Sequence, residues 1–254
     1  MPRRARDIIP NTPHHITQRG HNRLSVFAER VDYEYFLGNL FEWKELLDLK
    51  LHAWCLMTNH VHLIVEPGEN PDNVGALMRR IAGRQTRWVN KLEGRTGTLW
   101  GGRYHASPIQ THRYLLGCSR YIELNPVRAK MTARPEDYEW SSYRAKIGLA
   151  EEPGLDLDGC YLGLGRDRSA QQSAYAAFVG SGISEQEYAL IHNGIQRNQL
   201  TGDQSFVDEI ERRIGKRIEP RGHGRPRRHN ARRGKSGTPP LAQSLCGHLA
   251  DNES

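Results

Sequence analysis

The chain has 254 residues, of which 37% are hydrophobic and 26% are charged, and its formal net charge is +7. No apolar run approaches the roughly 20 residues that a membrane-spanning helix needs, so we expect no membrane partner, and the scattered cysteines fit a cytoplasmic location. The four cysteines are scattered and form no C-x-x-C pair, which argues against a zinc finger or a disulfide framework.

The first half of the chain alternates apolar runs with segments of helical periodicity. In chain order we expect a strand, a helix, two strands, a helix and a strand, at residues 14–18, 30–49, 51–57, 60–65, 73–92 and 99–109. Thr58 and Asn59 form the tight turn between the two central strands. This order predicts the α+β class and a ferredoxin-like, split βαβ sandwich, in which an antiparallel sheet carries helices on one face.

Two histidines lie two positions apart in the strand 60–65. Alternation along a strand places His60 and His62 on one face and turns Val61, Leu63 and Val65 toward a core. Two neutral imidazoles on one face can bind a single metal ion. The alternative is a half-exposed strand with two solvated histidines, because His-x-His is a short pattern with many chance matches.

A row of basic side chains follows the helix predicted at 73–92. Arg80, Arg84, Arg87 and Lys91 recur at intervals of four, three and four, so they share one face. Such a row is ordinarily a solvated face. Here the helix offers no Glu partners of the kind that stabilise surface helices, which favours contact with a phosphate backbone.

A further helix is predicted from about residue 112 to 124, with Thr111 as its N-cap and Pro126 after its end. Tyr121 and Asn125 are four residues apart, so the amide lies one turn beyond the phenol on the same side. Glu123 points away from them and is expected to be a surface or salt-bridging residue.

Several separated motifs resemble those of the single-tyrosine HUH transposases, and the motif at 120–129 most resembles the REP-associated tyrosine transposases. They are HHITQRG at 14–20, MTNHVH at 57–62, LWGGRY at 99–104, RYIELNPVRA at 120–129 and WSSY at 140–143. The resemblance covers roughly residues 8–148. It implies a ferredoxin-like catalytic domain that cuts and rejoins single-stranded DNA beside a palindromic hairpin, with Mg²⁺ or Mn²⁺. By the same resemblance His60 and His62 bind the metal, Tyr121 is the nucleophile, and Asn125 completes the metal site.

These residue types suit that chemistry. A phenol has an ordinary pKa of about 10 and needs help to lose its proton, and a divalent ion can polarise the scissile phosphate. Attack would give a 5′-phosphotyrosine and a free 3′-OH, a bond-conserving step that needs no nucleotide cofactor. The chain also has no G-x-x-x-x-G-K-[ST] phosphate loop. We therefore expect a DNA transposase that acts as a single-strand endonuclease and strand transferase.

Alternatives stay open at several points. Tyr114 shares roughly the face of Tyr121 and could be the nucleophile instead, although it lacks an amide four residues on. His105 and His112 could be metal neighbours, proton carriers or surface residues. A relaxase or replication initiator would share the chemistry, and a catalytically silent DNA-binding regulator would share the fold. The protein could be a monomer, or a homodimer in which Tyr121 serves the partner's histidines.

Charge divides the chain into unequal parts. Residues 1–130 carry 19 basic groups against 12 acidic ones, residues 131–215 carry 8 against 14, and residues 216–235 carry 9 against one. Two basic blocks separated by an acidic one suggest two surfaces for a polyanion. We expect a catalytic domain at 1–148, a helical appendage at 149–215 and a basic, disordered tail at 216–254.

The two C-terminal parts predict different roles. Helices are expected at 169–179, 184–198 and about 206–214, and their acidic balance favours packing or regulation over a helix-turn-helix. In the tail, the Gly-Arg-Pro core at Arg225 resembles an AT-hook for A·T-rich duplex, or else the tail binds any nucleic acid through phosphates. The residues expected to contact DNA are Arg19, Arg80, Arg84, Arg87, Lys91, Arg103, Arg225, Arg227 and Arg228.

Overall fold

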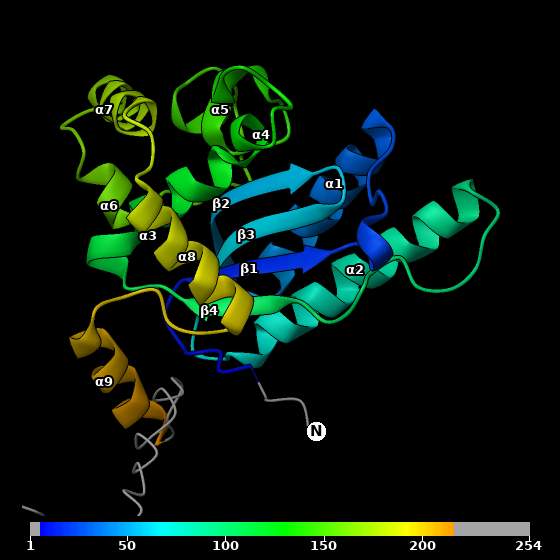
Figure 1. Cartoon of the computed structure of the whole chain (residues 1–254), viewed down its shortest axis with the longest axis horizontal. Helices are drawn as coiled ribbons and strands as arrows, with labels where there is room; N and C mark the ends of the chain where they lie inside the picture. The colour runs from blue at the N-terminus through cyan, green and yellow to red at the C-terminus, as the bar shows by residue number, and fades with distance from the viewer. Residues whose placement is uncertain (1–5, 216–254) are drawn as a thin grey trace, which may run out of the picture. The chain divides into compact units, whose positions relative to one another are not determined.

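Four strands form one sheet in the order β2-β3-β1-β4, and every neighbouring pair is antiparallel. The computed structural model describes residues 6–215, without the side chains of 111–113 and 204, so the predicted tail with Arg225, Arg227 and Arg228 lies outside the described residues. The strands are β1 His14–Arg19, β2 Leu49–Met57, β3 His60–Pro67 and β4 His105–Pro108. This order confirms the predicted ferredoxin-like topology within the α+β class (Figure 1).

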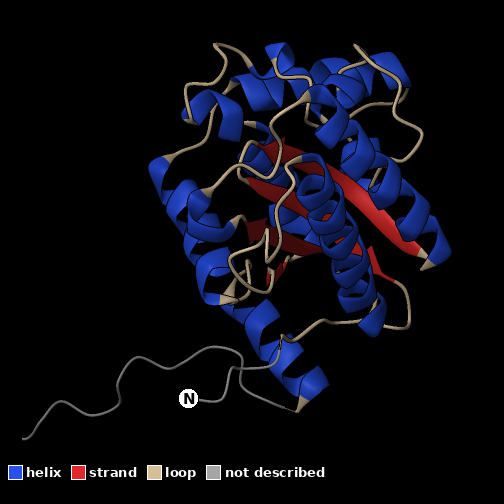
Figure 2. Cartoon of the chain, turned by 90° about the vertical axis from the view of Figure 1, so that its right-hand side faces the viewer, coloured by secondary structure: helices blue, strands red, loops and turns tan. Residues whose placement is uncertain are grey.

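Helices lie on both faces of this sheet (Figures 1 and 2). The helices are α1 Arg30–Leu46, α2 Asp72–Leu92, α3 Thr111–Glu123, α4 Asn125–Arg128, α5 Tyr143–Lys146, α6 Gly159–Leu162, α7 Arg168–Gly180, α8 Glu185–Arg197 and α9 Gln204–Ile214, with 3-10 turns at His21–Arg23 and Pro135–Asp137. The predicted pair α1 and α2 covers one face, and α3 and α8 cover the other. In the described residues no helix is both long and apolar enough to cross a membrane.

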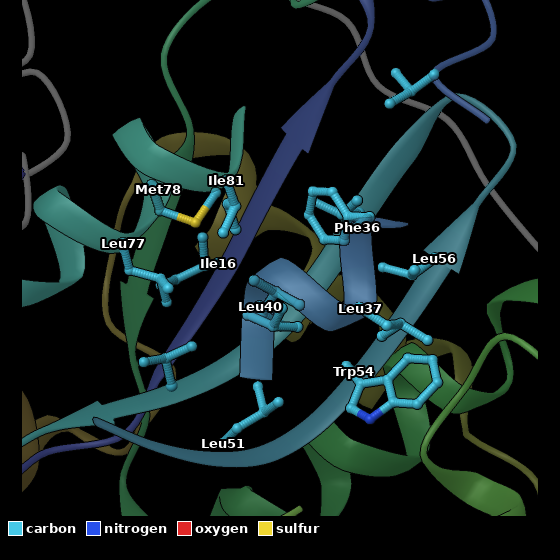
Figure 3. Close-up of a cluster of buried hydrophobic side chains, with 14 of the residues drawn as sticks. Ile16, Phe36, Leu37, Leu40, Leu51, Trp54, Leu56, Leu77, Met78 and Ile81 are labelled. Atoms are coloured by element: carbon cyan, nitrogen blue, oxygen red, sulfur yellow. The ribbon is translucent and has the colours of Figure 1, made fainter. Parts of the chain in front are cut away.

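The period-two pattern of β3 divides its side chains between two cores. Val61, Leu63 and Val65 are buried against α1 and α2, in the cluster drawn in Figure 3. Ile64 lies in the second core with Leu115 and other residues of α3. His60 and His62 have the same parity as Ile64, so the sheet presents both imidazoles to the face that α3 covers.

Two predicted boundaries are wrong. The strand expected at 99–109 is only β4, and before it the chain makes a single isolated bridge between Gly20 and Trp100. A Cβ on Gly101 would lie 3.3 Å from the Gly20 carbonyl oxygen, so the glycine permits a close crossing of two backbones rather than a ladder. Thr111 is the first residue of α3 and not its N-cap, which is Gln110.

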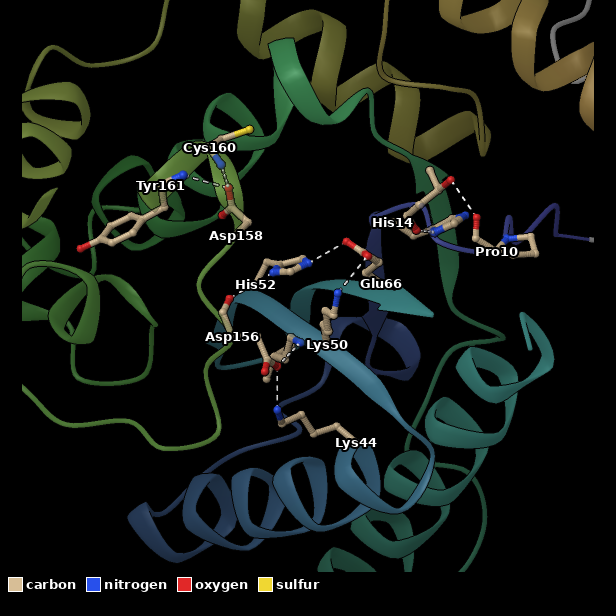
Figure 4. A network of polar contacts seen from close by, with 12 residues as sticks. Pro10, His14, Lys44, Lys50, His52, Glu66, Asp156, Asp158, Cys160 and Tyr161 are labelled. Atoms are coloured by element: carbon tan, nitrogen blue, oxygen red, sulfur yellow. Dashed lines mark hydrogen bonds and ion pairs between the residues drawn. The ribbon is translucent and has the colours of Figure 1, made fainter. Parts of the chain in front are cut away.

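The segment after α4 covers the exposed edge of β2. Main-chain hydrogen bonds join Leu56 N to Trp140 O and Ser142 N to Trp54 O, each over 2.9 Å. Farther along, the Asp156 carboxylate accepts from Leu51 N at 2.7 Å and pairs with Lys44 of α1 at 2.6 Å (Figure 4). The WSSY motif at 140–143 therefore closes the sheet edge.

His14 is held neutral at the start of β1 (Figure 4). Its Nδ1 donates to Thr12 O over 2.7 Å, and its Nε2 accepts from Ile9 N over 3.1 Å. Complete burial lowers the pKa of His14 from 6.5 to about 4. Between those values the unfolded chain binds more protons than the folded one, so stability is full above pH 6.5 and falls as the pH drops toward 4.

Because of His14 alone, we expect the free energy of unfolding to fall by about 2–3 kcal/mol when the pH is lowered from 7 to 4.5. His14→Gln should remove that share of the pH dependence, since a neutral amide does not titrate. Urea unfolding of both proteins at the two pH values checks this. An unchanged pH slope in the variant would show that His14 does not titrate as its burial indicates.

Candidate active site

Three histidines from two neighbouring strands meet on the α3 face of the sheet. The ring centroids of His60 and His62 lie 5.0 Å apart. Across the β1–β3 pairing, Nε2 of His15 lies 2.8 Å from Nδ1 of His62. Sequence interpretation missed His15, although it lies inside the HHITQRG motif, because only strand pairing brings it to His62.

The turn residue Asn59 fixes the tautomer of His60. Its amide nitrogen donates to Arg23 O over 3.0 Å, which directs Oδ1 toward the imidazole. That oxygen accepts from His60 Nδ1 over 2.7 Å. Because a neutral imidazole carries one proton, His60 Nε2 keeps its lone pair free. This is the arrangement in which an outer hydrogen bond orients a metal-binding histidine.

Burial keeps the histidine cluster uncharged. It lowers the pKa of His60 to about 3, with a contribution from the positive charge of Arg19, and the pKa of His15 to about 3. Burial and the neighbouring His60 hold the pKa of His62 well below its usual range. All three are therefore neutral at pH 7, which is the metal-binding form of histidine.

The donor set fits a small divalent ion only if an amide takes part. Among residues 6–215 no three His, Cys, Asp or Glu side chains form a group that could hold a metal. Asn125 lines the same cavity as His60 and His62. Its Nδ2 donates to Tyr121 O over 3.2 Å, so the amide oxygen is directed away from the helix carbonyls. Two imidazoles and one carboxamide oxygen are thus available.

Tyr121 lies between the histidine cluster and α8. Its side chain is only 3% exposed, and its ring centroid is 5.7 Å from that of His15 and 6.1 Å from that of His62. Its hydroxyl lies 3.2 Å from Nδ1 of His192. Burial, followed by the neighbouring Tyr188, raises the pKa of Tyr121 well above its usual value, so the phenol is protonated at pH 7.

One cavity of about 450 Å³ joins the predicted catalytic residues. Its walls include His60, His62, Tyr121, Asn125, Arg19 and Arg128. These side chains come from β1, β3, α3 and α4, so the fold collects them from four elements. The two arginines give the cavity positive charge, which suits a phosphate group.

Another wall of this cavity comes from α8, which sequence interpretation assigned only a packing or regulatory role. Tyr188 and His192, one turn apart, both line it. Their spacing of four is ordinary for one helix face and carries no chemical signature of its own. Their role in the cavity depends on how α8 is docked.

Several contacts dock α8 across α3 and β4. The Glu187 carboxylate pairs with Arg120 of α3, and a Cβ on Gly117 would lie only 2.6 Å from that carboxylate. At its other end, Asn198 in the left-handed region accepts from Ala106 N of β4 over 3.1 Å. At the start of α8, the Ser184 hydroxyl caps the helix by accepting from Glu187 N.

The other residues considered for the site have different surroundings. Tyr114 packs against the α3 core and is absent from the described lining of the cavity, whereas His105 lines it. Nδ1 of His105 is 3.2 Å from Oδ1 of Asn198. The side chain of His112 lies outside the described part of the chain.

Three of the four basic side chains in the row on α2 are exposed to solvent, and the fourth forms an ion pair with α1. Arg80, Arg87 and Lys91 are exposed. Arg84 is half-buried, and its NH1 lies 3.0 Å from the carboxylate of Glu42. This acidic partner comes from α1 and not from α2 itself. Arg84 was expected to lack an acidic partner because α2 offers none, and this expectation is wrong. The other three basic side chains are exposed to solvent.

Arg103 lies in a second cavity of about 930 Å³ beside α2, together with Arg79, Trp100 and Tyr104. Gln18 also lines this cavity. Its Nε2 donates to Gly102 O over 2.9 Å, and its buried Oε1 has no partner. The cavity thus combines two aromatic rings, arginine charge and a buried acceptor.

Comparisons with known proteins find a matching family model and relatives in sequence and in fold. Residues 9–125 match the model of the IS200-like transposases. A curated Haemophilus influenzae protein that bears the name of a REP-associated tyrosine transposase is 24% identical over 104 residues, which cover 37% of this chain and 59% of that protein. This chain thus spans about three fifths of that relative's length.

A solved structure, of a REP-associated tyrosine transposase bound to a REP hairpin, superposes with a TM-score of 0.52 and 19% sequence identity. The superposition covers 63% of this chain and 93% of that chain, and at this identity the likeness shows the fold alone. The family match spans both predicted histidines, Tyr121 and Asn125. Residues 9–125 are thus similar in sequence to the IS200-like transposases, and the chain shares its fold with the solved REP-associated tyrosine transposase.

Proposed function

We propose that this protein is a transposase that cuts and rejoins single-stranded DNA beside a palindromic hairpin, through a covalent bond between Tyr121 and a DNA 5′-phosphate. The observation that carries the proposal is the single cavity lined by His60, His62, Tyr121 and Asn125 together with two arginines. The hairpin bound by the structural relative supports this choice of DNA.

The six residues of the cavity named above each have a task in this reaction. The Tyr121 hydroxyl attacks phosphorus, its O–P bond forms, and the bond to the 3′-oxygen breaks. Arg19 and Arg128 hold the non-bridging oxygens of the phosphate. His60, His62 and Asn125 would hold Mg²⁺ or Mn²⁺, which when bound polarises the scissile phosphate. A 3′-OH from a second strand attacks the phosphotyrosine in the reverse reaction.

Two further surfaces would bind the rest of the DNA. The cavity with Arg103 suits a nucleotide, because Trp100 and Tyr104 can stack on a base while the Gln18 oxygen accepts from its edge. The exposed Arg80, Arg87 and Lys91 would follow the phosphate backbone. In the tail, Arg225, Arg227 and Arg228 would add affinity for A·T-rich or unspecific duplex.

The proposal is tested with end-labelled hairpin oligonucleotides in Mg²⁺, Mn²⁺ or EDTA. We expect a protein–DNA adduct that survives denaturing electrophoresis, forms with either metal, and is absent in EDTA. An unstructured oligonucleotide of the same composition should react less. Hairpin binding without any adduct, across many palindromes and both metals, would instead assign the chain to a catalytically silent DNA-binding regulator.

Asn59 should set the affinity of the metal site. Asn59→Ala removes the acceptor for His60 Nδ1, so the imidazole loses its fixed tautomer, and we expect Mn²⁺ to bind about 10- to 100-fold more weakly. Asn59→Asp is the matched control, since a carboxylate also accepts that hydrogen bond and should preserve affinity. Mn²⁺ titration followed by electron paramagnetic resonance measures both, and equal affinity for Asn59→Ala and the wild type would contradict the assignment.

A further inference from the structure

We propose that His192 of α8 is a catalytic residue that accepts the proton of Tyr121 when the phenol attacks DNA. The inference rests on the function proposed above and adds to it a residue beyond the family match, which ends at residue 125. The observation behind it is the contact of 3.2 Å between the Tyr121 hydroxyl and His192 Nδ1.

The other groups around Tyr121 are engaged elsewhere, are poor bases or make no hydrogen bond to its hydroxyl. Nε2 of His15 and Nδ1 of His62 face one another at 2.8 Å, and His60 Nδ1 donates to Asn59. The second ring nitrogen of His15, Nδ1, is buried without a hydrogen-bond partner, so it does not contact the Tyr121 hydroxyl in this way. A histidine that binds a metal through its remaining nitrogen cannot also take a proton there. Tyr188 contacts Tyr121 as well, but a phenol hydroxyl is a weaker proton acceptor than an imidazole nitrogen. Among the described histidines near Tyr121, His192 is the one whose ring nitrogen lies in hydrogen-bond contact with the hydroxyl, so it is placed to take the proton.

The ring of His192 is fixed in place by a column of side chains. It stacks on Tyr188 with 5.5 Å between centroids and an interplanar angle of 13°. The Arg128 guanidinium in turn lies over the Tyr188 ring, with its Cζ 3.8 Å from the ring centroid. Ile191 and Ile195 are fully buried beneath α8. The column and the buried face hold His192 Nδ1 toward Tyr121 without any DNA present.

The proton then has a defined route. In the tautomer with the proton on Nε2, the Nδ1 lone pair of His192 accepts the hydrogen of the Tyr121 hydroxyl. As the phenolic O–P bond forms and the 3′-O–P bond breaks, that proton moves to Nδ1, and the departing 3′-oxygen takes one from water. In the reverse direction an attacking 3′-OH releases its proton to water, and His192 returns its proton to the leaving phenolate.

The test compares His192→Ala, His192→Gln and the exposed neighbour Asn193→Ala. The measurement is the single-turnover rate of adduct formation on saturating hairpin DNA with Mg²⁺. Both His192 variants should react roughly 10²- to 10⁴-fold more slowly, and Asn193→Ala should match the wild type. Added imidazole should restore at least part of the rate to His192→Ala, whose missing ring leaves space for it, and none to His192→Gln.

Imidazole added to the wild type corrects for any competition for metal, while thermal melting and hairpin affinity confirm that each variant is folded. A His192→Gln rate equal to the wild type would overturn the proposal. So would a slow, folded, DNA-binding His192→Ala that imidazole does not accelerate, since the residue would then only shape the site. Failure of the proposed function is distinct, because in that case the wild type itself forms no adduct.

Discussion

Tyr121→Phe is expected to abolish the protein–DNA adduct. The substitution removes only the attacking oxygen and leaves the ring that packs against His15 and His62. It also removes the hydrogen bond to His192, which contributes only about 1 kcal/mol to stability. The variant should therefore fold and bind the hairpin like the wild type, yet give no labelled band after denaturing electrophoresis.

Tyr114→Phe is the matched control for this experiment. Both tyrosines lie on α3, seven residues apart, but Tyr114 packs in the α3 core rather than along the described walls of the cavity. We expect it to form adduct at the wild-type rate. The reverse pattern, with adduct retained in Tyr121→Phe and lost in Tyr114→Phe, would exchange the two roles.

Lys146→Met should produce the largest loss of stability, because it leaves a carboxylate without its charge partner in the interior. Glu123 at the end of α3 is fully buried and lies 3.2 Å from the buried Lys146 Nζ. The carboxylate also accepts from the hydroxyls of Ser142 and Tyr175, each over 2.6 Å. Removing one partner of a buried pair typically costs 3–5 kcal/mol, and we expect about that loss in urea unfolding.

The double variant Glu123→Leu, Lys146→Met separates a charge effect from a packing effect. Replacing both members removes the unpaired charge, so the double variant should be more stable than Lys146→Met alone. Simple addition of the two single losses would show that the charges are not coupled. Because Glu123 follows Tyr121 by two residues, this network also anchors the end of α3 that carries Tyr121 and leads into Asn125 of α4.

Local periodicity accounts for what could be predicted from the sequence. The alternation in β3 depends only on neighbouring residues, so the shared face of His60 and His62 follows directly from their spacing. The apolar stripe of α2 likewise predicts its bounds to within one residue. Glu123, expected at the surface or in a salt bridge, has the salt bridge but is buried, because α5 and α7 close over it.

Residues that depend on tertiary contacts could not be predicted in this way. His15 reaches His62 through the pairing of β1 with β3, 47 positions apart in sequence. His192 reaches Tyr121 only because Gly117 and Asn198 let α8 dock on α3 and β4. Arg84 finds its acidic partner on α1. In each case the sequence contains the residue type but not its partner.

Mass spectrometry of the digested adduct identifies the residue that is covalently bonded to DNA. Wild-type protein is reacted with hairpin DNA, treated with nuclease and protease, and the peptides are sequenced to find the one that bears a nucleotide. We expect a nucleotide linked through its 5′-phosphate to Tyr121 and to no other residue. A nucleotide on Tyr114, on Tyr188 or on a residue outside the cavity would contradict it.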